Sequence, residues 1–158
     1  MIALKLVRLI ETHSDQLARA LIHKVETSSK CAELRKLVPH AELQNRVHEV
    51  YKNLSDWLND KTEHDIFLTY TNLGKRRFEQ GVPFHDFMWG LLLTKQTLWE
   101  FLESEVVEDS GIQLRSEFEL LQLIAQFYDK ALYYASLGYW EAHQFEEQTH
   151  EHKVMHAV

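Results

Sequence analysis

The sequence predicts an all-α protein built from about five long amphipathic helices. Three observations support this fold class. Apolar residues recur at steps of three and four along most of the chain. The 158 residues contain only five glycines and two prolines, few for a chain with many tight turns. Apolar residues make up 45% and charged residues 26%, which is typical of one globular domain spanning 1–158.

The first half of the chain predicts two helices. Apolar residues follow a helical period from Ile2 to Val25, and the polar run 27–29 ends this first helix. Pro39 is tolerated near a helix start but not inside a helix, so a second helix is expected over 41–58. Its apolar stripe consists of Leu43, Val47, Val50, Leu54 and Trp57.

The next two predicted helices are bounded by clear end signals. Thr62, with Asp65 three residues later, is typical of a helix N-terminus, so we expect a helix over 63–80. Gly81 suits a left-handed residue after a helix, and Pro83 suits the first turn of the next one. A fourth helix is therefore predicted over 84–103, followed by a loop at 108–111.

The fifth predicted helix begins near Ile112 and reaches about Glu147, with a polar segment over 143–158 that is prone to fray. Two apolar seams run side by side along it, one from Leu114 to Ala142 and one from Leu120 to Gly138. A helix with two apolar stripes needs two partners. Burial within its own chain and contact with a second chain are equally compatible with this pattern. Predicted helix four has the same character, so two chains can form a four-helix bundle from these helices.

Charge and cysteine usage exclude several classes of function. The formal charge of −7 and the pI near 5.8 disfavour nucleic acid and anionic membrane surfaces as partners. Cys31 is the only cysteine, so no intramolecular disulfide forms and a reducing compartment fits. Neither a signal peptide nor an apolar membrane-spanning run is recognisable. We therefore expect a cytoplasmic protein.

Four of the ten histidines lie near the C-terminus, where metal binding has to be weighed. His143 with Glu147, and His152 with His156, have the one-turn spacing of helical metal ligands. The two pairs lie roughly 13 Å apart along one helix, too far to share a metal. A site in a bundle needs such pairs on facing helices, and helices one to four carry no second pair. We therefore predict no metal site and keep these four residues as the weak alternative.

No catalytic motif is recognisable, and we expect the protein not to be an enzyme. His85 and Asp86 are neighbours on a predicted helix, where their side chains point about 100 degrees apart. Their plainest role is at the helix start. The sequence has no nucleophile elbow, phosphate-binding loop or dinucleotide-binding motif. An active site assembled from scattered residues would leave no such trace.

The segment from 73 to 99, LGKRRFEQGVPFHDFMWGLLLTKQTLW, carries a family resemblance. It resembles the N-terminal domain family of RsbR-type co-antagonist proteins, which regulate stress responses and are similar to sensor globins without haem. In those globins the haem-ligating histidine follows a Leu-Gly or Ile-Gly pair. Leu73-Gly74 and Gly81 match the flanking markers, and the ligand position falls on Arg77. Arginine has no free lone pair for iron, so the resemblance implies a globin-like fold without haem.

The resemblance implies a non-enzymatic, homodimeric sensor module that contacts an unknown signalling protein. The last two helices would then form the dimer, with interface candidates Leu98, Leu121, Tyr128, Leu132 and Tyr139. A small apolar or anionic lipid-like ligand is the expected input, although such aromatic residues more often form the core. The pocket candidates are Phe67, Tyr70, Arg77, Phe78 and Trp89, with Arg77 available to pair an anionic head group. The alternative is a haem- or metal-binding sensor that uses the histidines, with His85 or His64 reaching the iron.

Overall fold

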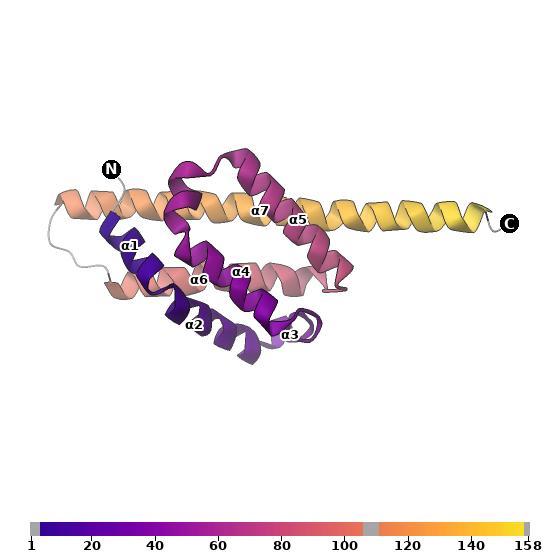
Figure 1. Ribbon diagram of the computed structural model, residues 1–158, viewed down its shortest axis with the longest axis horizontal. Helices are drawn as coiled ribbons and strands as arrows, with labels where there is room; N and C mark the ends of the chain where they lie inside the picture. Colours follow the sequence, from indigo (N-terminus) through magenta and orange to yellow (C-terminus); the bar gives the residue numbers. More distant parts are fainter. Residues whose placement is uncertain (1–3, 106–110, 157–158) are drawn as a thin grey trace.

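The all-α prediction is confirmed. The computed structural model describes residues 4–105 and 111–156, which are helical almost throughout and include no β-strand (Figure 1). In chain order the elements are α1 (Leu4–Thr12), α2 (Ser14–Thr27), the 3-10 turn η1 (Ser29–Cys31), α3 (Ala32–Leu37), α4 (His40–Lys52), the π-helical turn η2 (Asp56–Asp60), α5 (Glu63–Glu79), α6 (Phe84–Glu105) and α7 (Gly111–His156). None of the described helices combines the length and the apolar character that crossing a membrane requires.

The predicted first and second helices are each interrupted. At His13, with φ −97° and ψ 18°, the chain leaves the helical region and separates α1 from α2. In the second segment α4 ends at Lys52, and the chain continues through the π-helical turn η2. Both interruptions lie inside continuous apolar patterns, so periodicity alone did not reveal them.

The end signals around α5 act as predicted. The Thr62 side chain accepts a hydrogen bond from the Asp65 amide, and the Asp65 carboxylate accepts one from the Thr62 amide, which completes a capping box. At the other end Gly81 has φ +80°, a left-handed conformation that glycine adopts without strain. Pro83 then precedes the first residue of α6.

Helix α7 is the spine of the molecule (Figure 1). Its first part lies within the bundle, with α6 running antiparallel to it and α5 crossing it, while its C-terminal part extends past the other helices. The helix continues to His156, beyond the point where the sequence predicted fraying. The predicted loop residues 108–110 lie outside the described residues.

Helices α5 and α7 cross through two glycines. A Cβ atom added to Gly74 would lie only 2.7 Å from the backbone nitrogen of Tyr139 and would overlap the carbonyl oxygen of Ala135. A Cβ atom added to Gly138 would overlap the Thr71 carbonyl in the same way. The two helices are therefore in direct backbone contact, which only residues without a side chain permit.

Three predicted interface residues belong to the core of the single chain. Leu98, Tyr128 and Tyr139 are buried against other helices of the same molecule, with at most 7% of each residue exposed. The seam from Leu120 to Gly138 is the better covered of the two, since Leu120, Ile124, Phe127 and Ala131 are all buried within the chain. Leu121 and Leu132 are half-buried and keep part of their surface free.

Candidate ligand cavity

A cavity of about 70 Å³ lies between α2, α4, α5, α6 and α7, with one residue of α3 also in its wall. Most of the wall is aliphatic and comes from the stripes that the sequence assigned to the core. The aliphatic and phenyl side chains of the wall are Leu21, Ile22, Val25, Leu34, Leu43, Val47, Val50, Leu73, Phe87 and Leu91. An apolar enclosure with a few convergent polar groups is the usual form of a small-molecule site.

The polar residues of the wall are Arg46, Tyr70, Arg77, Thr94 and Tyr128. Two of them have buried polar atoms without a hydrogen-bond partner among the described residues, namely Nε of Arg46 and the hydroxyl of Tyr128. Buried polar groups in folded proteins are nearly always paired. The cavity therefore holds two donors that the protein itself leaves unsatisfied.

The phenol of Tyr128 is a hydrogen-bond donor at neutral pH. Burial raises its pKa well above the ordinary value, and the neighbouring phenols of Tyr51 and Tyr70 raise it further. Tyr51 is also buried, but its hydroxyl donates to the backbone oxygen of Thr94 at 2.8 Å. Of these two deeply buried tyrosines, Tyr51 has its hydroxyl paired, and Tyr128, which lines the cavity, has its hydroxyl unpaired among the described residues.

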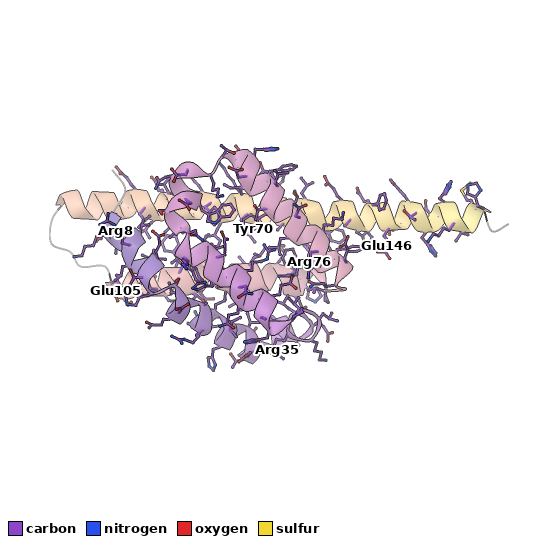
Figure 2. All side chains as sticks on the ribbon, viewed as in Figure 1. Arg8, Arg35, Tyr70, Arg76, Glu105 and Glu146 are labelled. Carbon is purple, nitrogen blue, oxygen red and sulfur yellow. The ribbon has the colours of Figure 1, made fainter. Side chains whose placement is uncertain are left out.

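An ion-pair cluster closes one side of the cavity. Nη1 of Arg77 donates to Oε1 of Glu42 at 2.7 Å and to Oε1 of Gln80 at 2.8 Å, with only 2% of the Arg77 side chain exposed. The hydrogen bond from Arg76 is the main cause that lowers the pKa of Glu42 to about 2, and hydrogen bonding from Arg77 adds to it. Arg76 lies on the outer face of α5, where Figure 2 labels it.

This cluster changes the role expected for Arg77. The sequence predicted that its guanidinium would pair an anionic head group. In the structure the guanidinium already pairs with Glu42, a carboxylate that it shares with Arg76, so it stabilises the junction of α4 and α5 instead. Burial lowers the pKa of Arg77, and the Glu42 hydrogen bond counteracts that effect.

Of the five predicted pocket residues, Tyr70 and Arg77 line the cavity, and the other three lie elsewhere. Tyr70, Leu73 and Arg77 share one face of α5, whereas Phe67 and Phe78 lie on the face that packs against α7. The sixth-helix residue Trp89 lies outside the cavity, under the ammonium group of Lys30 at 4.0 Å.

Sequence reasoning missed Arg46 and assigned Tyr128 to the wrong kind of contact. A signal for Arg46 existed, because it lies three residues after Leu43 and four before Val50, inside the apolar stripe of α4. A charged residue within an apolar stripe is unfavourable unless it finds a counter-ion or a hydrogen-bond partner. No comparable signal existed for Tyr128, since an aromatic residue on a seam does not reveal what it faces.

The residues present do not fit haem. The position that matches the globin ligand is Arg77, held in its ion pair with Glu42. The described residues that line the cavity include no histidine, cysteine or methionine, and burial raises the pKa of its two tyrosines, Tyr70 and Tyr128, which disfavours the phenolate that would bind iron. His85, one of the residues proposed to reach iron, has 85% of its side chain exposed. A cavity of about 70 Å³ is also far smaller than the several hundred Å³ that ligand pockets for large cofactors occupy.

The C-terminal histidines do not assemble into a metal centre in the described part of the chain. No group of three or more potential ligands lies close enough to hold an ion among those residues. His143 lies 3.7 Å from Glu147, and the rings of His152 and His156 have centroids 4.2 Å apart. Each pair is thus a neighbour contact along the exposed part of α7.

Two residues with chemical potential for catalysis, Cys31 and Asp86, have structural roles. Burial is the main cause that raises the pKa of the Cys31 thiol to about 11, so the thiol stays protonated and unreactive at neutral pH. Asp86 lies in the first turn of α6 as expected, and its Oδ2 accepts a hydrogen bond from the Glu33 amide of α3 at 3.0 Å. Neither residue lines the cavity.

Comparison with known families places the chain. Residues 14–152 match the family model described as the RsbT co-antagonist protein rsbRD N-terminal domain. The match begins at the first residue of α2 and ends within the exposed part of α7, so it includes every helix that lines the cavity. No curated protein and no solved structure matches the chain significantly. The chain therefore belongs to the RsbT co-antagonist protein rsbRD N-terminal domain family, whose members are regulatory modules of stress signalling.

Proposed function

We propose that this domain is a non-enzymatic sensor module that forms a homodimer in the cytoplasm and signals by contact with another protein. In this proposal α6 and α7 take the places of the last two helices of a sensor globin. The two helices of one chain and the two of its twin form a four-helix bundle. The main support is an incompletely covered apolar surface on α6 and α7.

That surface, here called the α6–α7 band, joins residues of two neighbouring helices. Leu92 of α6 is 41% exposed and Trp140 of α7 is 43% exposed, while Leu121 and Leu132 of α7 are half-buried. The rings of Phe84 and Trp140 connect the two helices with centroids 5.0 Å apart. Apolar side chains on two adjacent antiparallel helices are the usual contact surface of a bundle.

The exposed end of α7 supports a role in transmitting a signal. Figure 2 labels Glu146 on the part of α7 that extends beyond the other helices. In this segment Phe145 is 72% and Met155 77% exposed. A helix that leaves the bundle with apolar residues on its surface offers a contact site for a second protein or for the twin chain.

The oligomeric state tests the proposal. Size-exclusion chromatography with light scattering at micromolar concentration should give twice the chain mass of 18.7 kDa. We expect Leu92→Glu to shift the protein to a monomer, because a dimer would bury this carboxylate without a partner. Leu68→Glu is the matched control, since Leu68 is a leucine of similar exposure, 45%, on α5 and outside the band.

The measurements distinguish a dimer through the α6–α7 band from a monomer and from a dimer through another surface. A dimer in the wild type and in Leu68→Glu, together with a monomer in Leu92→Glu, supports the proposal. A wild-type monomer at these concentrations overturns the homodimer. Equal effects of both substitutions place the dimer contact somewhere other than the α6–α7 band.

A further inference from the structure

We propose that the cavity binds a short-chain monocarboxylate, whose carboxylate accepts hydrogen bonds from Nε of Arg46 and from the hydroxyl of Tyr128. The inference deepens the proposed sensor function by naming the class of ligand, and it rests on that function only for its physiological meaning. The binding itself follows from the unpaired donors, the charge and the size of the cavity.

The first argument is the pair of unsatisfied donors. Tyr128 is 2% exposed, lines the cavity and has no hydrogen-bond partner for its hydroxyl among the described residues. Arg46 also lines this cavity, and its Nε is buried and equally unpaired among the described residues. An unpaired buried donor is unfavourable, and an acceptor on a ligand removes that penalty. The guanidinium only donates and the protonated phenol has a hydrogen to donate, so one acceptor group on a ligand can satisfy both.

The second argument is charge. None of the described carboxylates lies within ion-pair distance of the guanidinium of Arg46. The other arginine of the wall, Arg77, has its counter-ion in Glu42. The cavity thus has one cation without a partner. A carboxylate supplies two acceptor oxygens and the missing negative charge, which an alcohol or a ketone does not.

The third argument is size. An enclosed apolar cavity of about 150 Å³ holds benzene, and the present cavity has about half that volume. A hydrocarbon body of a few carbon atoms fits, and its methylene groups contact the aliphatic wall. A long acyl chain would extend beyond the 70 Å³ of the cavity, so in this proposal a short acid takes the place of the lipid-like ligand suggested by the sequence.

Titration calorimetry of the full chain with sodium butyrate tests the inference. The matched ligand is 1-butanol, which has the same number of carbon atoms and no charge. Sodium chloride at the same concentration controls for ionic strength. We expect saturable binding of butyrate and at least ten-fold weaker binding of butanol. Acetate through octanoate should show an optimum at short chain length, because the cavity volume limits the hydrocarbon body.

Two variants and two controls assign the binding to the cavity. Arg46→Gln and Tyr128→Phe should each weaken butyrate binding about ten-fold or more. The controls Arg19→Gln and Tyr133→Phe change exposed residues of the same types on α2 and α7 and should bind like the wild type. Val47→Phe fills the cavity from its partly buried wall, and a folded Val47→Phe protein should no longer bind butyrate.

Several results would overturn the proposed carboxylate binding. Absence of binding for all acids from acetate to octanoate overturns the inference, as does equal binding of butanol and butyrate. Unchanged affinity in both Arg46→Gln and Tyr128→Phe places any binding site elsewhere and overturns it too. Light scattering on the same samples separates this result from the dimer. Loss of butyrate binding in a dimer refutes the ligand class alone, and butyrate binding by a monomer refutes the homodimer alone.

Discussion

The unpaired hydroxyl of Tyr128 lowers the stability of the ligand-free protein, although the proposed ligand binds to it. Replacing it with hydrogen removes an unpaired buried donor and leaves the ring in place. We therefore expect Tyr128→Phe to raise the free energy of unfolding by about 1 kcal/mol in the absence of ligand. Urea denaturation followed by circular dichroism measures this change.

Tyr51→Phe is the counterpart, because the hydroxyl of Tyr51 donates to the Thr94 carbonyl. The same chemical change should lower the free energy of unfolding here by about 1 kcal/mol. Destabilisation of similar size in both variants would mean that the Tyr128 hydroxyl has a partner after all.

Glu42 is the residue on which the buried guanidinium of Arg77 depends. Glu42→Gln keeps the shape but removes the negative charge beside a side chain that is 2% exposed. We expect it to lower the free energy of unfolding by about 2 kcal/mol, in the range for hydrogen bonds to charged groups. Arg76→Gln removes the other, exposed partner and should have a clearly smaller effect in the same urea titration.

The same carboxylate gives the pH dependence a definite sign. The pKa of Glu42 is lowered from 4.5 to about 2 in the folded state, so its contribution is complete above pH 4.5 and is lost as the pH falls toward 2. Between these values the stability of the wild type should fall more steeply than that of Glu42→Gln. Parallel curves would show that Glu42 does not carry the dependence.

At the scale of single residues, the sequence predicted where Arg77 lies better than it predicted which group Arg77 binds. Arg77 was identified by comparison with the globin ligand position, and it does line the cavity. Its ion pair with Glu42 joins residues 35 positions apart. Such a pairing depends on how α4 and α5 dock, which no local pattern encodes.

At the scale of helices, the contact of α5 with α7 allows a sharp test. Gly74→Ala places a Cβ atom inside the backbone of α7, where no side chain can move aside. We expect the free energy of unfolding to fall by about 3 kcal/mol or more, at the upper end of the range of about 1–3 kcal/mol for overpacked cores. Thermal unfolding measures it.

Gly90→Ala is the matched helical control. Its added Cβ atom would meet only Cδ2 of the Leu34 side chain, at 2.9 Å, and a side chain can shift. The gain of about 1 kcal/mol in helix propensity offsets part of that strain. Equal losses in Gly74→Ala and Gly90→Ala would argue against direct backbone contact between α5 and α7.

Helix ends proved more predictable than helix interruptions. The Thr62–Asp65 capping box and the left-handed Gly81 were read from the sequence, because both depend on residues within one turn. The break at His13 and the π-helical turn η2 have no such residues, and an apolar stripe runs through each. They arise from packing against the remaining helices.

At the scale of the whole molecule, the sequence showed that α7 needs two partners but not which seam faces which. In the structure Tyr128 and Tyr139 pack against helices of the same chain, and the α6–α7 band stays partly exposed. Periodicity reports how much apolar surface a helix has. Only the tertiary arrangement decides where that surface goes, so the fold class was predictable and the cavity wall was not.

The glycine crossing gives the molecule a mechanical property. The backbones of α5 and α7 are in contact at Gly74 and Gly138. A displacement of one helix therefore cannot be absorbed there by a change of side-chain rotamer. Leu73, the neighbour of Gly74, is part of the cavity wall. From Gly138 the helix runs on for about 27 Å to His156, at 1.5 Å per residue. A small tilt at this fulcrum therefore becomes a larger swing at the far tip, as in a lever with one short and one long arm.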